Sequence, residues 1–507
     1  MNFLKNSWII RSFRKTSALC FLSALLLAFA FPKISISVLA FFALVPLFFA
    51  LDNKNYRESF SIGYLFGVLF FLMIFYWIMY TVSIAVLLLV FYLAFYPAIF
   101  ALGYRFLKKQ NPLIKAFVLP SLWVCLEFMR AHLFSGLGWA SIGHSQSENI
   151  IFIQIADITG VYGISFVLVM FNLALKEILT DLKENKKYKI MTLGVAFLFV
   201  CLCFFYGYYR IQNIVYTDQI RVSVVQGSVE QERKWNYDLW PAILNDYFDL
   251  TRAAAKTKPD IIIWPETAYP GFMWENPKRF VNVQNFVRVT DFPVLIGVIT
   301  RENDSYFNSA ILLDSSGEAV KRHDKLHLVP FGEYLPFRKE FPWLGALVPF
   351  EDFQTGKEYT LFSSYGDKGK RNPFGVLICF EDTIAELSRN FVLKGAKFLV
   401  NITNDGWFED SSEPFLHAQN AIFRSVENKV PLIRAANTGV SGFINAVGQM
   451  YKTVQDSSGR RTYVSGFATA NVYLTEEKTF YTKFGDIFTY LCFGVILVGA
   501  AIRLRRN

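Results

Sequence analysis

Three residues whose types cooperate in acyl transfer stand at the ends of expected strands. Cys379 follows the apolar run 374–378 and precedes a segment with helical spacing, so it lies at a turn between a strand and a helix. Glu266 closes the apolar run 261–264, and Lys325 precedes another short apolar run. A helix N-terminus favours the thiolate, the nucleophilic form of cysteine. The pattern indicates nucleophilic catalysis by a thiol.

Each of these residues, taken alone, has an ordinary structural explanation. A free cysteine is usually a small buried hydrophobic group, a glutamate after a strand is usually solvated, and a lone lysine is usually a surface charge. The other cysteines weaken that explanation for Cys379, because all of them fall in long apolar runs: Cys20, Cys125, Cys201, Cys203 and Cys492. Cys379 is thus left without a partner in the polar part of the chain. An unpaired thiol in an oxidising compartment is open to unwanted oxidation, so its presence there favours a functional role.

Several separated motifs follow one another in an order that is typical of one family. They are VVQGS at 224–228, KWN at 234–236, LVPFGEYLP at 328–336, NITNDGWF at 401–408 and RAANTG at 434–439. Together with Glu266, Lys325 and Cys379, they resemble the nitrilase superfamily, and within it the bacterial apolipoprotein N-acyltransferases. The resemblance covers residues 219–474.

The resemblance implies both a fold and a mechanism. The fold is α/β, a nitrilase-like four-layer αββα sandwich inserted in an eight-helix transmembrane bundle. Cys379 would form a thioester, with Glu266 as the general base. Lys325 would stabilise the oxyanion, together with a backbone N–H that follows the cysteine.

Four further residues are carried over as supporting or substrate-binding groups. Glu333 would fix Lys325 or the leaving group, and Trp235 would form one wall of the acyl entrance. Glu381 is carried over without a derived role. Phe380 stands where the family has tyrosine, which leaves no hydroxyl beside the nucleophile.

Composition indicates a membrane protein with a globular insert. Hydrophobic residues make up 53% of the 507 residues, and they gather in apolar runs on both sides of a polar region. We therefore expect a bundle of seven helices at 1–210, a catalytic domain at 215–478 and a last helix at 482–503. Residues 1–30 also fit a signal peptide, but a second apolar run follows almost at once, which favours retention. The eight expected spans are 16–32, 34–51, 59–80, 82–105, 113–130, 161–180, 190–208 and 483–502.

Basic residues predict the orientation of these spans. They gather at 5–15, 54–57, 105–109, 176–189 and 503–506, which are the two ends of the chain and alternate connections. The positive-inside rule then places both termini in the cytoplasm and the catalytic domain in the periplasm, anchored to the bacterial inner membrane. The net charge of +10 is largely this topology signal, so it does not favour a nucleic-acid partner.

A membrane anchor favours a lipid substrate, because it holds the active site at the surface of the bilayer. The expected reaction is ping-pong: Cys379 takes an acyl chain from a phospholipid, the sn-1 chain of phosphatidylethanolamine, and passes it to the α-amino group of a diacylated apolipoprotein. No cofactor and no metal is expected. Three alternatives stay open: another amine acceptor such as a glycolipid, a membrane-tethered amidase or nitrilase, and a transporter or receptor with an inactive nitrilase-like domain.

Two aromatic loops and one pair of charges complete the predictions. The apolar loops 269–274 and 341–350 are expected to face the membrane, with local core packing as the alternative. Glu127 and Arg130 share one face of the fifth span. Charges at that depth are usually functional, but an ion pair that anchors the loop 136–139 explains them equally well.

Overall fold

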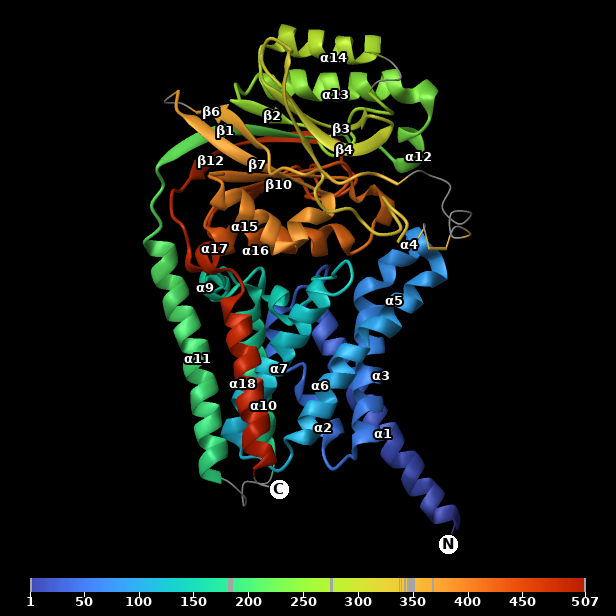
Figure 1. Cartoon of the computed structure of the whole chain (residues 1–507), viewed down its shortest axis with the longest axis vertical. Coiled ribbons are helices and arrows are strands. Elements are labelled where there is room, and N and C mark those ends of the chain that lie inside the picture. The colour runs from blue at the N-terminus through green and yellow to red at the C-terminus, as the bar shows by residue number, and fades with distance from the viewer. Residues whose placement is uncertain are drawn as a thin grey trace. The chain divides into compact units, whose positions relative to one another are not determined.

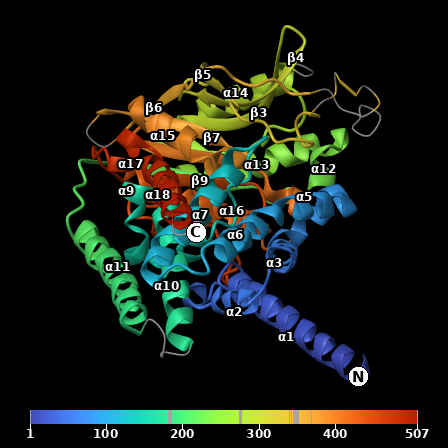
Figure 2. The same cartoon turned by 60° about the horizontal axis from the view of Figure 1, so that its bottom comes forward.

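Two compact units make up the chain. The computed structural model describes residues 2–180, 186–273, 277–336, 338, 340, 341, 343, 352–366 and 369–505. One unit comprises Met1–Asn213 and Phe484–Asn507, and the other comprises Ile214–Lys483. The first is helical and the second is α/β, as the cartoons in Figures 1 and 2 show.

The helical unit contains long apolar helices. Among the described residues, six are long and apolar enough to cross a membrane: Tyr56–Val82, Val86–Phe106, Pro112–His132, Val161–Leu179, Lys186–Gln212 and Ile487–Leu504. The first two expected spans are not among these six. One lies in a 28-residue helix, and the other is divided into a 3₁₀ helix, Ser37–Phe41, and a short α-helix. The count of eight spans stays a prediction.

One helix of this unit, Tyr56–Phe75, begins at a capping motif that is visible in the sequence. The side chain of Asn55 accepts a hydrogen bond from the backbone of Glu58, and the Glu58 side chain accepts one from the backbone of Asn55, which forms a capping box. The helices of this unit are α1 (Asn2–Phe29), α2 (Val45–Leu51), α3 (Tyr56–Phe75), α4 (Met79–Val82), α5 (Val86–Leu93), α6 (Phe95–Phe106), α7 (Pro112–His132), α8 (Ile150–Ile153), α9 (Ala156–Thr159), α10 (Val161–Leu179), α11 (Lys186–Gln212) and α18 (Ile487–Leu504).

The α/β unit is built on two sheets. Within the described residues each sheet has six strands, in the orders β12-β1-β2-β3-β4-β5 and β11-β10-β9-β8-β7-β6. The strands β1, β2 and β3 are parallel, as are β7, β8 and β9, and antiparallel strands flank both sets. The strands are β1 (Asp218–Gln226), β2 (Ile261–Ile263), β3 (Val294–Glu302), β4 (Ser305–Leu313), β5 (Ala319–Asp324), β6 (Leu361–Tyr365), β7 (Arg371–Ile378), β8 (Phe398–Thr403), β9 (Leu432–Ala436), β10 (Gly442–Ile444), β11 (Met450–Thr453) and β12 (Gly466–Leu474).

Helices cover the outer face of each sheet (Figure 1). The longest of these helices are α13 (Trp240–Ala255) and α16 (Glu413–Asn428). The helices α13 and α14 pack on the first sheet, and α15 and α16 pack on the second. The helices of this unit are α12 (Gln231–Lys234), α13 (Trp240–Ala255), α14 (Pro277–Thr290), α15 (Ala385–Leu393), α16 (Glu413–Asn428) and α17 (Phe480–Phe484).

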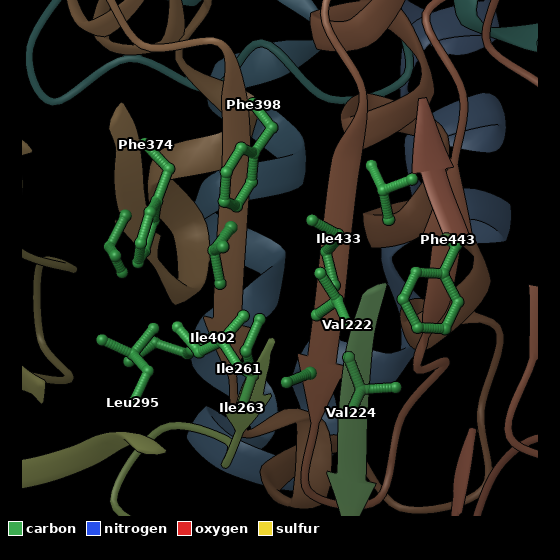
Figure 3. Close-up of a cluster of buried hydrophobic side chains, with 14 of the residues drawn as sticks. Val222, Val224, Ile261, Ile263, Leu295, Phe374, Phe398, Ile402, Ile433 and Phe443 are labelled. Atoms are coloured by element: carbon green, nitrogen blue, oxygen red, sulfur yellow. The ribbon is translucent and has the colours of Figure 1, made fainter. Parts of the chain in front are cut away.

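The strand sequences explain these layers, because side chains alternate between the two faces of a strand. In β2, Ile261 and Ile263 pack between the sheets, whereas Ile262 packs under α13 and α14. In β7, Ile378 packs between the sheets and Leu377 packs under the helices of the other side. Figure 3 shows the central layer, where side chains of both sheets point toward one another. Strands buried on both faces must be apolar throughout, which gives the continuous runs in the sequence.

The aromatic loops are only partly described. Tyr269, Pro270 and Gly271 are buried, and Tyr269 belongs to the core under α13, so local packing accounts for these residues. Phe341 and Trp343 are 50% and 67% exposed. Trp274 and residues 344–350 lie outside the described residues, so the prediction of membrane-facing loops stays untested there.

Candidate active site

The structure brings the three predicted residues together. Each follows directly on a strand or lies within three residues of its end: Glu266 after β2, Lys325 after β5 and Cys379 after β7. The ammonium of Lys325 lies 4.0 Å from the carboxylate of Glu266, and both groups interact electrostatically with the thiol of Cys379. Glu266 and Lys325 are 6% and 1% exposed. An acid, a cation and a thiol therefore share one site that is largely shielded from water.

A second carboxylate, that of Glu333, and the side-chain amide of Asn308 also lie beside Lys325. Glu333 lies 2.8 Å from the ammonium of Lys325. The side-chain amide of Asn308, in β4, donates to Glu266 at 2.7 Å and to Glu333 at 2.9 Å. The backbone carbonyl of Asn308 also accepts a hydrogen bond from the backbone N–H of Lys325. Asn308 thus orients both carboxylates around the lysine.

Charge neighbours decide the protonation of the lysine and the thiol. Burial alone would lower the pKa of Lys325, but Glu333, Cys379 and Glu266 outweigh it and raise this pKa above its ordinary value. Burial raises the pKa of the Cys379 thiol well above its ordinary range, and the charge of Glu266 raises it further, while Lys325 opposes the shift. The raised pKa keeps the thiol protonated at neutral pH.

The α-helix expected to begin at the turn of Cys379 begins later in the chain. A 3₁₀ helix, Cys379–Thr383, begins at the cysteine, but the α-helix α15 begins only at Ala385. The dipole of a helix acts mainly within its first turn. Burial and the neighbouring carboxylate therefore dominate at Cys379.

The backbone at Cys379 is strained. Its φ is +54°, in the left-handed region that non-glycine residues rarely adopt. Such a conformation costs about 1–3 kcal/mol and persists only where surrounding contacts enforce it. One such contact comes from Asn401, whose side-chain amide donates to the carbonyls of Leu377 at 3.2 Å and Cys379 at 3.0 Å.

Glu381, for which the sequence analysis predicted no role, connects the turn of Cys379 to the segment that follows Lys325. Its carboxylate accepts hydrogen bonds from the backbone N–H groups of Ile378 at 2.7 Å, Leu326 at 2.5 Å and His327 at 3.0 Å. It therefore ties the turn of Cys379 to the segment that follows Lys325. Burial raises the pKa of Glu381 to about 7, although these hydrogen bonds oppose the shift.

One group of side chains has the spacing of a metal site. In the part of the chain that the structure describes, ligand atoms of Asp405, Glu413 and His417 lie within 4.8 Å of one another. The guanidinium of Arg434 lies 3.5 Å from Asp405, so a positive charge already occupies this neighbourhood. The NITNDGWF motif, which contains Asp405, is the one signal in the sequence analysis that touches this cluster.

Comparisons with known proteins place the chain in a family. The model of the apolipoprotein N-acyltransferase N-terminal domain matches residues 23–174, and that of carbon-nitrogen hydrolases matches residues 221–463. The apolipoprotein N-acyltransferase of Geobacter metallireducens is 36% identical, over 97% of this chain and 96% of its own length. The chain belongs to the apolipoprotein N-acyltransferase family. The resemblance drawn from the motifs is thereby confirmed.

Other apolipoprotein N-acyltransferases and solved structures are also similar to the chain. The apolipoprotein N-acyltransferase of Chlorobaculum tepidum is 28% identical over the full length of both chains. Among solved structures, Saccharomyces cerevisiae Nit3, a member of branch 10 of the nitrilase superfamily, is 16% identical. It covers 51% of this chain and 91% of its own, with a TM-score of 0.38.

The two aromatic residues that were predicted to support the site, Trp235 and Phe380, both lie near other rings. Trp235 is 47% exposed, and its ring centroid lies 6.5 Å from that of Phe272. Phe380 is half-buried and stacks on the ring of His327, with centroids 6.1 Å apart. A phenyl ring that stacks on His327 therefore occupies the position beside Cys379. The role predicted for Trp235 stays a prediction.

Glu127 and Arg130 of the helical unit hold a loop. Glu127 accepts hydrogen bonds from the indole of Trp123 at 2.8 Å and from the backbone of Ile142 at 2.7 Å. Arg130 donates to the carbonyls of Leu137 at 3.0 Å and Trp139 at 2.5 Å. These contacts fit the structural alternative, in which the two charges anchor the loop that follows α7.

Proposed function

We propose that the protein transfers an acyl chain from a phospholipid to the α-amino group of the N-terminal diacylglyceryl-cysteine of apolipoproteins, through a thioester on Cys379. Membership of the apolipoprotein N-acyltransferase family supports an acyltransferase of lipoprotein biosynthesis. The observation that carries the mechanism is the shielded group of Glu266, Lys325 and Cys379 at the strand ends. This reaction would be the last step of lipoprotein maturation.

In the first half-reaction, Glu266 removes the proton of the thiol as the sulfur attacks the ester carbonyl of the phospholipid. Negative charge develops on the carbonyl oxygen, where the Lys325 ammonium and a backbone N–H after Cys379 stabilise it. The tetrahedral intermediate then expels the glycerol oxygen, which takes the proton from Glu266. The products are a lysophospholipid and the acylated Cys379.

In the second half-reaction, the neutral α-amino group of the acceptor attacks the thioester. Glu266 accepts a proton from the amine, and the Cys379 sulfur leaves and is protonated again. Lys325 acts on the oxyanion in both halves, which requires that it stay charged throughout. Glu333 and Glu266 favour that charge, as the raised pKa of Lys325 reflects. Neither half-reaction needs a cofactor.

The arrangement in the membrane is part of the same proposal. Long apolar helices and family membership make this a membrane protein. The distribution of basic residues supports an eight-span protein of the bacterial inner membrane with its catalytic domain in the periplasm. Phosphatidylethanolamine is the proposed donor.

Mass spectrometry of the intact protein in vesicles tests the thioester. After incubation with phosphatidylethanolamine, we expect one acyl adduct on Cys379, and adding a diacylated lipopeptide should discharge it to give a triacylated product. An adduct that only an aminoglycolipid discharges would indicate another acceptor. Ammonia release from amides without any acyl adduct would indicate an amidase and overturn the proposal.

A further inference from the structure

A cluster of five buried charged or titratable side chains contacts the turn of Cys379, and the proposed reaction uses none of them. His417 is the central member and lies against three of the others. Each of the five is at most 1% exposed: Asp382, Asp405, Glu413, His417 and Arg434. Burial of so many charges is costly unless they are paired. The partners of each charged group therefore show which segments of the chain the cluster holds in place.

Both ring nitrogens of His417 face oxygen acceptors. Nε2 lies 2.8 Å from the carboxylate of Asp382 and 3.2 Å from the carbonyl of Cys379. Nδ1 lies 3.0 Å from the carboxylate of Asp405 and 3.6 Å from Glu413. A neutral imidazole has a proton on only one nitrogen, so it would direct a lone pair at one of these carboxylates. The contacts therefore favour a ring that is protonated on both nitrogens.

The remaining charges balance this cation. The guanidinium of Arg434 lies 2.5 Å from Asp382 and 3.5 Å from Asp405. Burial raises the pKa of Glu413 well above its ordinary value, and Asp405 adds to the shift, which favours the neutral acid. Burial would lower the pKa of His417, but Asp382 and Asp405 raise it to about 10 against the opposing charge of Arg434. Two cations then face two carboxylates.

We propose that His417 is a positioning residue: as an imidazolium it holds the carbonyl of Cys379 and the carboxylate of Asp382, and so fixes the turn that carries the nucleophile. This inference rests on the proposed function of Cys379. The turn needs such support because Cys379 has a φ of +54°. His417 and Asn401 both donate to the same carbonyl, and Asp382 lies within the 3₁₀ helix that begins at the cysteine. A small displacement of a nucleophile can cost about 100-fold in rate.

Nitrogen NMR of the full-length protein tests the protonation state. The protein is labelled with ¹⁵N-histidine and placed in phosphatidylethanolamine vesicles at pH 8.5, where an ordinary histidine is neutral. We expect one histidine with two protonated ring nitrogens, and its signals should be missing from His417→Gln. A neutral His417 ring would overturn the proposal. So would shifts of a metal-bound ring nitrogen that EDTA abolishes, because a metal would then take the place of the Nδ1 proton.

Single-turnover acylation of Cys379 tests the consequence for the nucleophile. In His417→Gln we expect thioester formation to slow by about 10- to 100-fold at an unchanged KM for phospholipid, because substrate contacts are intact. Asp405→Asn keeps the ring but removes the charge opposite Nδ1, and should slow the step similarly. His132→Gln is the matched control: it makes the same substitution at an exposed position of α7, so its rate should stay within about twofold of the wild type.

The outcomes separate this inference from the proposed function. A wild-type protein that forms no thioester would refute the role of Cys379 itself. A wild-type thioester that forms equally fast in His417→Gln would refute only the positioning role. A rise in KM at an unchanged rate constant would also refute it, because the cluster would then act on lipid binding.

Discussion

Replacing Lys325 by methionine should separate its part in stability from its part in chemistry. The ammonium lies 2.8 Å from Glu333 and 4.0 Å from Glu266, and it is 1% exposed. At an effective dielectric constant of about 20, unit charges at these distances attract by about 6 and about 4 kcal/mol. Lys325→Met leaves two buried carboxylates without their cation, and breaking a buried pair in this way typically costs about 3–5 kcal/mol of stability.

The same change should slow thioester formation for a different reason. Removing one oxyanion donor typically costs about 100- to 1,000-fold in rate. The pKa of the Cys379 thiol should rise further, because Lys325 is the neighbour that lowers it. Alkylation of Cys379 by iodoacetamide should therefore require a higher pH than in the wild type.

The double variant Lys325→Met, Glu333→Gln distinguishes the two effects. It removes both charges of the closer pair, so most of the lost stability should return, as measured by thermal unfolding in detergent. Thioester formation, followed by mass spectrometry, should stay about 100- to 1,000-fold slow because the oxyanion donor is still missing. Lys321→Met, at an exposed position of β5, the strand that Lys325 follows, is the control and should behave as the wild type. Recovery of the rate in the double variant would refute the role of Lys325 in the transition state.

Three further predictions concern the nucleophile, Glu381 and the topology. Cys379→Ser should abolish turnover in a folded, inserted protein, because a serine hydroxyl ionises far less readily than a thiol; more than a few per cent residual activity would exclude Cys379 as the nucleophile. Burial raises the pKa of Glu381 from its usual 4.5 to about 7. The folded state then binds this proton more tightly than the unfolded state, so the group's contribution to stability is full below pH 4.5 and falls by up to about 3 kcal/mol as the pH rises through 7. Thermal unfolding of Glu381→Gln should lack that part of the pH slope, and an unchanged slope would contradict the raised pKa. A reporter active only outside the cytoplasm should be active when fused after Arg210 and silent when fused after Lys187, whereas the reverse pattern would place the domain in the cytoplasm.

The strand ends that carry the proposed catalytic residues were predictable from local signals. Apolar runs bounded by polar residues located β2 and β7, and the residues beyond them, Glu266 and Cys379, lie close to the strand ends as expected. The motifs also identified the family, because their order along the chain can be read from the sequence without knowledge of the fold. The charge of Lys325 was predictable too, although its burial was not.

The groups that orient the site depend on contacts between distant segments. Asn308 faces Glu266 and Glu333 only because β4 pairs with β5 and places it beside Lys325. Glu381 joins residues that lie more than fifty positions apart, and no local pattern distinguishes it from a solvated glutamate.

The period of burial in each strand, the apolar helices and the family could all be predicted from the sequence, since they follow from neighbouring residues and from motif order. Which charges face one another depends on how the chain packs. That information sets the protonation of Cys379 and Lys325 and places His417 against the nucleophile's turn. The physical reason is that pKa values depend on burial and on distances of a few ångströms, and these exist only once the two sheets and their helices have packed.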